Sequence, residues 1–176
     1  MELLSLLQAQ ANSITKQLRK LYIWVEERNL GNPNTPSMLG MHLMSELGKS
    51  EFTLIDSVNR KLDFKDSFRG RETSLLPFKN AGVRYLIIGE VETEYSSKYL
   101  NNFFYYAQGV IRITDVTNGE VITDIPIKSK GYHRSKKQAG LNALANAGKD
   151  VSKSIIDAIL AIEDKTIKTH DRGDKN

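Results

Sequence analysis

The chain has 176 residues, of which 40% are hydrophobic and 26% are charged, a composition typical of one globular domain with its own core. Its net charge of +4 permits binding to an anionic partner without requiring it. Cysteine is absent, which excludes disulfides, thiolate nucleophiles and zinc–thiolate sites.

The sequence carries no clear targeting signal. No stretch approaches the roughly 18 consecutive apolar residues that a membrane-spanning helix needs. The opening stretch Met1–Leu7 is too short for a signal peptide, and it has Glu2 where such a peptide is basic. We therefore expect either a cytoplasmic protein or one whose targeting segment and lipid-modified cysteine precede this sequence.

Residues 1–19 are predicted to form an amphipathic helix before a single α/β domain over residues 20–163. Its apolar stripe fits docking against the domain and also fits a partner-binding surface. The stripe consists of Leu3, Leu4, Leu7, Ala11, Ile14 and Leu18.

The first half of the domain is predicted to contain two short strands around a helix. Leu21–Glu26 alternates with the period of a strand, and Phe52–Asp56 is a second short strand. Between them, Thr35 is predicted to be the N-cap of a helix that has Pro36 at its first position. Gly48 is predicted to mark the end of this helix.

A central strand is predicted over Val83–Tyr95, after a short helix over Glu72–Asn80. The first half of the strand is almost continuously apolar, as in a strand covered on both faces. In the second half, acidic residues at every other position predict one solvent-exposed side. These acids are Glu90, Glu92 and Glu94.

The next segment, Tyr95–Tyr106, is predicted to be an aromatic connection between strands. It holds six of the fourteen aromatic residues in the chain. Mixed with small polar residues, these aromatics suit protein recognition, although they could instead cover the edge of the core. They are Tyr95, Tyr99, Phe103, Phe104, Tyr105 and Tyr106.

The clearest local signal is a hairpin over residues 107–127. Ala107–Asp115 alternates with a period of two, and Val121–Ile127 resumes the alternation. Between them, Asn118–Gly119 is predicted to form a type I′ turn, because both residues tolerate positive φ. Pro126 cannot donate a ladder hydrogen bond, so the second strand is predicted to lie at a sheet edge or to be bulged at this residue.

A long helix is predicted over Ser135–Glu163, and residues 164–176 are predicted to be a flexible charged tail. The element order predicts an α/β (α+β) fold. We expect a small mixed sheet of about five strands, packed by a short helix from the N-terminal half and by the long C-terminal helix.

No catalytic, cofactor-binding or metal site is predicted. The three histidines, His42, His133 and His170, lie in separate elements without metal-ligand spacing. Phosphate-binding glycine loops and nucleophile-elbow spacing are also missing from the sequence. We therefore expect no enzymatic activity.

The segment Lys128–Lys137 has five basic residues and no acid. One interpretation is a solvated loop that leads into a helix, although cations in the first turn oppose the macrodipole. Together with Tyr132, the segment could instead bind phosphates and stack a base, or meet an anionic partner or membrane surface. A cytoplasmic nucleic-acid-binding domain is therefore an alternative function. The basic residues are Lys128, Lys130, Arg134, Lys136 and Lys137.

Three segments resemble one group of bacterial envelope domains. Leu43–Asp56 is similar to the helix, short turn and F-x-hydrophobic-hydrophobic-D strand of that group. Ala81–Val91 and Val110–Ile122 are similar to its A-G-A-x-Y and hydrophobic-R-hydrophobic-x-D strands. The group comprises the curli secretion channel CsgG, the amino-terminal domain of TolB, the penicillin-binding-protein activator LpoB and the flagellar assembly protein FlgT. The resemblance covers about residues 20–160.

The resemblance implies a non-enzymatic, lipoprotein-like module of the periplasm or outer membrane that acts as an accessory or assembly factor. Its partner would be another envelope protein or a second copy of the chain, and not a nucleic acid. It would contact the membrane only through an N-terminal anchor missing from this sequence. The segment Tyr95–Tyr106 is too short to be the membrane-crossing hairpin of the secretion channel. We assign partner binding to the aromatic and basic segments together.

Overall fold

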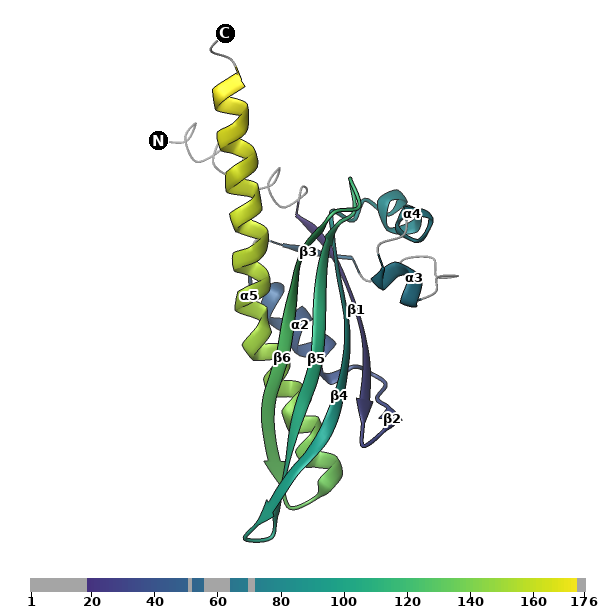
Figure 1. The fold of residues 1–176 in the computed structure, drawn as a ribbon, viewed down its shortest axis with the longest axis vertical. Helices are drawn as coiled ribbons and strands as arrows, with labels where there is room; N and C mark the ends of the chain where they lie inside the picture. The colour runs from purple at the N-terminus through teal and green to yellow at the C-terminus, as the bar shows by residue number, and fades with distance from the viewer. Residues whose placement is uncertain (1–18, 51, 56–63, 70–71, 174–176) are drawn as a thin grey trace, which may run out of the picture.

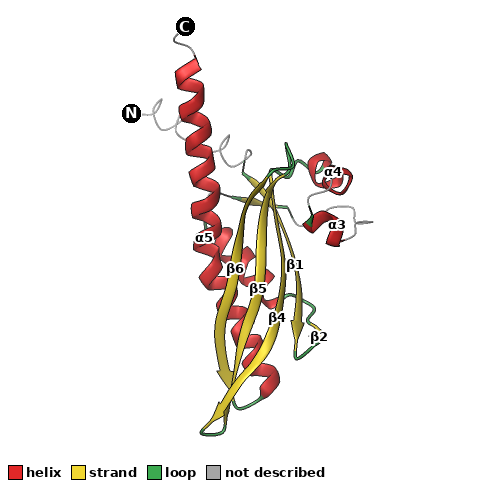
Figure 2. Ribbon diagram, viewed as in Figure 1, coloured by secondary structure: helices red, strands yellow, loops and turns green. Residues whose placement is uncertain are grey.

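The computed structural model describes residues 19–50, 52–55, 64–69 and 72–173. They form one mixed sheet of six strands with helices on both faces (Figures 1 and 2), which confirms the predicted fold class. The strands are β1 (Lys20–Asn29), β2 (Asn32–Pro33), β3 (Thr53–Leu54), β4 (Tyr85–Tyr99), β5 (Asn102–Asp115) and β6 (Val121–His133). The helices are α2 (Met38–Leu47), α3 (Phe64–Phe68), α4 (Glu72–Asn80) and α5 (Lys136–Gly173).

The strand order is β2-β1-β4-β5-β6, and β3 pairs with β1 outside this path. β1 runs parallel to β3 and β4, and the other pairs are antiparallel. β4 is central, and its residues Leu86, Ile87 and Ile88 are fully buried, as the continuous apolar run predicted. β6 lies at an edge of the sheet, which confirms the prediction made from Pro126.

The two faces of the sheet are covered to different extents. Ile23 of β1 packs in a core with α2 and α5, whereas its neighbour Tyr22 packs in a second core with α3 and α4, because successive strand residues point to opposite faces. The first core extends along β5 to Tyr105, but the second includes no residue of β4 beyond Ile88. Beyond Ile88, no described helix covers this side of the sheet, and we call the uncovered part the open face.

The sheet is long and narrow, and we name its two ends. The distal end holds the turn between β4 and β5, at the bottom of Figure 1. The proximal end holds α3, α4 and the start of β1. β4 alone has 15 residues, so it spans about 50 Å between these ends.

Helix α2 begins at Met38, and its N-cap is Ser37 rather than the predicted Thr35. The Ser37 hydroxyl accepts a hydrogen bond from the backbone N–H of Gly40 at 2.8 Å. The buried carboxylate of Glu27 on β1 accepts another from the N–H of Met38 at 2.8 Å, and its charge complements the helix dipole. The start of α2 is therefore fixed by a side chain from a neighbouring strand, which local sequence does not show.

The type I′ turn predicted at Asn118–Gly119 is wrong. Gly119 has a φ of +76°, but Asn118 does not have a positive φ. The loop is longer than two residues, and the N–H of Gly119 donates to the carbonyl of Asp115 at 2.8 Å. Between β4 and β5, Leu100–Asn101 instead has two positive φ values, 45° and 63°, as a type I′ turn requires.

The segment Tyr95–Tyr106 is consequently strand and not the predicted connection. β4 continues to Tyr99 with a register shift between Tyr95 and Ser97, and β5 begins directly after the two-residue turn. β6 likewise continues to His133, so most of the basic segment predicted as a loop is also strand. The prediction failed because Leu100–Asn101 lacks the glycine that usually marks a tight turn.

Helix α5 extends to Gly173, beyond the predicted end at Glu163. The apolar periodicity stops at Glu163, but the sequence has no glycine or proline from there to Gly173 that would break the helix. The helix predicted over residues 1–19 lies outside the described residues, apart from Arg19. In the described part of the chain, no helix combines the length and the hydropathy needed to cross a bilayer.

Candidate functional site

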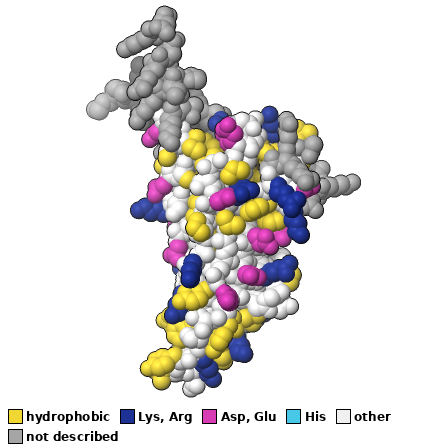
Figure 3. Space-filling view, viewed as in Figure 1, with side chains coloured by type: hydrophobic (Ala, Val, Ile, Leu, Met, Phe, Trp, Pro, Cys, Tyr) yellow, Lys and Arg dark blue, Asp and Glu magenta, His cyan; other side chains and the backbone are white. Residues whose placement is uncertain are grey.

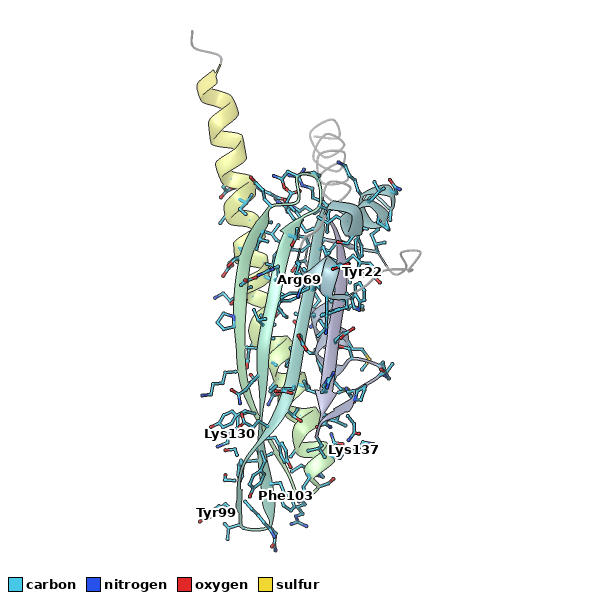
Figure 4. The ribbon with its side chains drawn as sticks, turned by 45° about the vertical axis from the view of Figure 1, so that its right-hand side comes forward. Tyr22, Arg69, Tyr99, Phe103, Lys130 and Lys137 are labelled. Atoms are coloured by element: carbon cyan, nitrogen blue, oxygen red, sulfur yellow. The ribbon has the colours of Figure 1, made fainter. Side chains whose placement is uncertain are left out.

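Four segments meet at the distal end of the sheet: the end of β4, the start of β5, the end of β6 and the start of α5. The strand register pairs Tyr106 with Lys130, so the predicted aromatic and basic segments lie side by side. The residues predicted for partner binding therefore come together, and strand alternation divides them between two faces. Figure 4 shows at this end Tyr99, Phe103, Lys130 and Lys137.

Five of these residues form what we call the open-face cluster: Phe104, Tyr106, Lys128, Lys130 and Tyr132. The Phe104 and Tyr132 rings pair across β5 and β6 with centroids 5.6 Å apart. The Lys130 Nζ lies 4.7 Å from the Phe104 ring centroid, and the Lys128 Nζ lies 5.4 Å from that of Tyr106. These cation–π contacts hold the ammonium groups over aromatic rings on a face that no described helix covers.

The aromatic residues on the opposite side face α5. Tyr105 is buried in the core, so it is not available to a partner. Tyr95 packs its ring against Tyr105 with centroids 5.6 Å apart but is 54% exposed. Phe103 is half-buried and lies beneath two ammonium groups, with Lys98 at 5.2 Å and Lys136 at 5.4 Å from its ring centroid.

The remaining predicted residues are exposed around the tip. Tyr99 is the last residue of β4 and is 67% exposed. Arg134 follows β6, and Lys137 lies in the first turn of α5. The Lys137 carbonyl accepts a hydrogen bond from Asn29 Nδ2 at 3.0 Å, which ties the start of α5 to the end of β1.

Two asparagines of α5 cover the outer edge of β6 at the distal end. Asn146 Nδ2 donates to the Lys130 carbonyl at 2.9 Å, and Asn142 Nδ2 donates to the Tyr132 carbonyl at 3.0 Å. Four residues along a helix span nearly the same length as two residues along a strand. The two amides therefore reach alternate carbonyls of β6. These contacts were missed in the sequence, although two asparagines four residues apart on a helix beside a sheet edge would be a usable signal. They occupy carbonyls that an added strand would need.

Beyond Glu94, which lies opposite Tyr106 in the strand register, the distal end is strongly basic. The segments 95–114 and 125–149 contain no Asp or Glu. Six basic residues lie at this end, whereas the whole chain has a net charge of +4. The rest of the chain therefore carries a net negative charge. Figure 3 shows basic and hydrophobic side chains at the narrow distal end and acidic side chains further up the same view. The basic residues are Lys98, Lys128, Lys130, Arg134, Lys136 and Lys137.

A tyrosine with a raised pKa lies far from this surface. Burial, together with the charge of Glu163, raises the pKa of Tyr85 to about 12. The Tyr85 hydroxyl donates to Glu163 at 3.1 Å, and Arg19 donates to the same carboxylate at 2.8 Å. This contact fastens α5 to the proximal end. Among the described residues, no group of three or more His, Cys, Asp or Glu side chains is arranged to hold a metal.

A protein-family model described as TP0693-like lipoprotein, C-terminal domain, matches residues 23–156 of the chain. Among curated protein sequences, none matches. Similar solved structures include the hypothetical protein CT253 from Chlamydia trachomatis, with a TM-score of 0.51 at 13% identity over 80% of this chain and 94% of that one. At this identity, the likeness shows the fold alone.

Two further similar structures belong to proteins named in the predicted group. TolB from Acinetobacter baumannii has a TM-score of 0.45 at 16% identity, over 80% of this chain and 28% of that one. The C-terminal domain of LpoB from Salmonella enterica has a TM-score of 0.37 at 16% identity, over 66% of this chain and 83% of that one. The resemblance to CsgG and FlgT stays a prediction.

Proposed function

Because the chain belongs to the family of TP0693-like lipoprotein C-terminal domains, we propose that it is a non-enzymatic protein-binding module of the bacterial cell envelope. Its role would be that of an accessory or assembly factor. The partner would be another envelope protein or a second copy of the chain. The nucleic-acid alternative gains no support from membership of a lipoprotein family.

The observation that carries this proposal is the open-face cluster. Tyr132 is 63% exposed, and Lys128 and Lys130 are exposed beside it. Tyrosine is enriched at the centres of protein interfaces, where a rigid ring supplies contact area at low entropic cost. Ammonium groups already held over rings lose little freedom when they meet carboxylates of a partner.

The binding surface is also rigid. The edge strand that bears Lys130 and Tyr132 is held to α5 through Asn142 and Asn146. Those bonds cover the strand edge, so we assign binding to the side chains of the open face rather than to β-strand addition at this edge. A partner would therefore meet a preformed surface, which lowers the cost of binding.

Site-specific photo-crosslinking in cells tests the proposal. p-Benzoylphenylalanine at position 132 should give a protein adduct of defined mass, because Tyr132 lies within the surface. The same label at position 76 on α4, where Leu76 is also exposed, is the matched control and should not give that adduct. Mass spectrometry would identify the partner as an envelope protein or a second copy. Equal labelling from both positions, or an adduct with nucleic acid, would contradict the proposal.

A further inference from the structure

Two turns of the protein each present an exposed leucine in a left-handed backbone conformation. Leu100 has a φ of 45° and is 75% exposed, and Leu30 has a φ of 55° and is 37% exposed. Each opens a two-residue turn whose second residue, Asn101 or Gly31, also has a positive φ. The residues that flank each turn pair with each other, so both are tight hairpin turns of the same kind.

Leucine is a poor choice at these positions on grounds of stability. Its Cβ is crowded in the left-handed region, which asparagine and glycine adopt far more readily. An apolar side chain at a solvent-exposed tip also gains nothing from the core. An observed backbone outlier of this kind points to a functional constraint, and here the constraint is to expose an apolar side chain.

Both turns point toward the distal end, as Figure 1 shows for the β1–β2 and β4–β5 hairpins. Their relative position is fixed by a short chain of hydrogen bonds. The N–H of Leu30 donates to Thr93 Oγ1 at 2.9 Å, and that hydroxyl donates to Asn29 Oδ1 at 2.9 Å. Asn29 Nδ2 then donates to the Lys137 carbonyl at 3.0 Å. One network therefore joins the β1–β2 turn, β4 and the start of α5.

The side chains around the Leu100 tip are aromatic and basic. Tyr99 precedes the turn and is 67% exposed. Lys98 lies beside it, and Lys136 and Lys137 are exposed on the first turn of α5. The segment 95–114 that forms this tip contains no acid. Exposed leucine, interfacial tyrosine and a ring of lysines are the features of a surface that binds anionic lipid headgroups.

We propose that the distal end makes a peripheral contact with an anionic lipid bilayer, with Leu100 and Tyr99 in the headgroup boundary and Lys98, Lys136 and Lys137 on lipid phosphates. The contact is shallow, because the backbone groups of a turn cannot enter the hydrocarbon unpaired. This goes beyond the expectation that only an N-terminal anchor meets the membrane.

A lipid surface suits these features better than a pocket in a protein. Leu100 projects from a hairpin turn rather than from an apolar ridge, and Lys98, Lys136 and Lys137 around it are exposed. A flat anionic surface can meet the Leu100 tip and the lysines around it at once, whereas the Leu30 turn, beside Thr93, lies further back along β4. The open-face cluster lies on another side of the strands, so lipid binding and protein binding do not compete for the same side chains.

The direct test is co-sedimentation of the full chain with vesicles. We expect binding to vesicles of equal parts phosphatidylglycerol and phosphatidylcholine, and little binding to phosphatidylcholine alone. Leu100→Asn should lower the partition coefficient about tenfold, because it removes one buried leucine side chain. Leu76→Asn, at an exposed leucine of α4, is the matched control and should bind like the wild type.

Leu100→Asn also has a second expected effect. Its melting temperature should equal or exceed that of the wild type, because asparagine tolerates the left-handed conformation. A variant that folds at least as well yet binds lipid less separates function from folding. Absence of wild-type binding to the anionic vesicles, or wild-type binding by Leu100→Asn, would overturn the proposal. A negative result in these vesicle experiments would not change the crosslink that we expect from position 132.

The charge requirement is tested separately. The double variant Lys136→Gln and Lys137→Gln should weaken binding to the anionic vesicles by on the order of tenfold or more. Lys149→Gln and Lys153→Gln, two exposed positions further along α5, form the control and should have little effect. Equal losses in both double variants would show that net charge, and not the distal end, drives binding, and would contradict the proposal.

The orientation can be measured with one probe, because the chain has no cysteine. A cysteine introduced at Ser97, beside the tip, can be labelled with the environment-sensitive dye NBD. Its emission should shift to the blue on the anionic vesicles, and the same label at position 76 should not respond. The same response from both positions would overturn the proposed orientation.

Discussion

At the proximal end of the sheet, the rings of Tyr22 and Phe78 pack with centroids 5.1 Å apart, and both side chains are buried. At the distal end, Phe104 and Tyr132 pack at a similar 5.6 Å, but Tyr132 is largely exposed. The geometry of the two pairs is alike, and the difference lies in what covers them. Phe78 belongs to α4, and the first pair lies in a core with Phe64 of α3, whereas no described helix covers the second pair.

Charged residues show the same contrast. Proximal arginines face carboxylates, as in Arg19 with Glu163 at 2.7 Å and Arg84 with Asp115 at 3.0 Å. The distal lysines of the open face lie over aromatic rings instead. Charges satisfied within the fold contribute to its stability, whereas charges left for solvent remain available to a partner. We infer that the two ends of one sheet separate the residues that stabilise the fold from those available for the proposed binding.

The largest expected effect is at the proximal end. Phe78→Ala should lower the free energy of unfolding by about 3–5 kcal/mol, because it leaves a cavity at a fully buried aromatic position. Tyr132→Ala should change it by about 0.5 kcal/mol or less, as expected at an exposed site. Urea denaturation measures both values. Equal losses would show that the distal aromatics belong to the stabilising core, and the contrast between the ends would be wrong.

A second effect concerns the fastening of α5 at Tyr85. Tyr85→Phe should cost about 1–2 kcal/mol, because it removes the hydroxyl that donates to the Glu163 carboxylate. The pKa of Tyr85 is raised from 10.0 to about 12. This part of the stability is therefore complete below pH 10 and is lost as pH rises toward 12. Denaturant unfolding of the wild type and of Tyr85→Phe across this pH range should show a loss of stability in the wild type that the variant lacks. Parallel pH profiles would argue against a contribution from the Tyr85–Glu163 hydrogen bond.

The sequence predicted more of the fold than of the candidate site. Alternation found β4, β5 and β6, and Pro126 correctly placed β6 at an edge, because these signals are local. The Leu100–Asn101 turn was missed because leucine is unusual in the left-handed conformation that Leu100 adopts. The meeting of the aromatic and basic segments depends on the register that pairs Tyr106 with Lys130, and register is a tertiary property. The role of these side chains in partner binding stays a prediction.

The β5–β6 loop and the β4–β5 turn give a pair of opposite effects on stability. Gly119→Val should cost about 1–2 kcal/mol, because it forces a β-branched residue to a φ of +76°. Leu100→Asn should instead stabilise the protein by up to about 1 kcal/mol, because it relieves the same kind of crowding. Thermal unfolding compares the two variants with the wild type. A destabilised Leu100→Asn would show that this leucine serves folding, and its proposed functional role would lose its basis.

The smallest effect on stability should come with the largest effect on binding. Lys128→Glu and Lys130→Glu together should change the free energy of unfolding by about 0.5 kcal/mol or less, because both side chains are exposed. The control pair is Lys149→Glu and Lys153→Glu on α5, which makes the same change in net charge at exposed positions away from the open-face cluster.

The photo-crosslink from position 132, measured in these two double variants, tests most directly whether the open-face cluster is the binding surface. We expect the adduct to be lost with Lys128→Glu and Lys130→Glu and kept with the control pair, while both proteins unfold like the wild type. An adduct that survives reversal of Lys128 and Lys130, or that disappears equally in the control, would contradict the account.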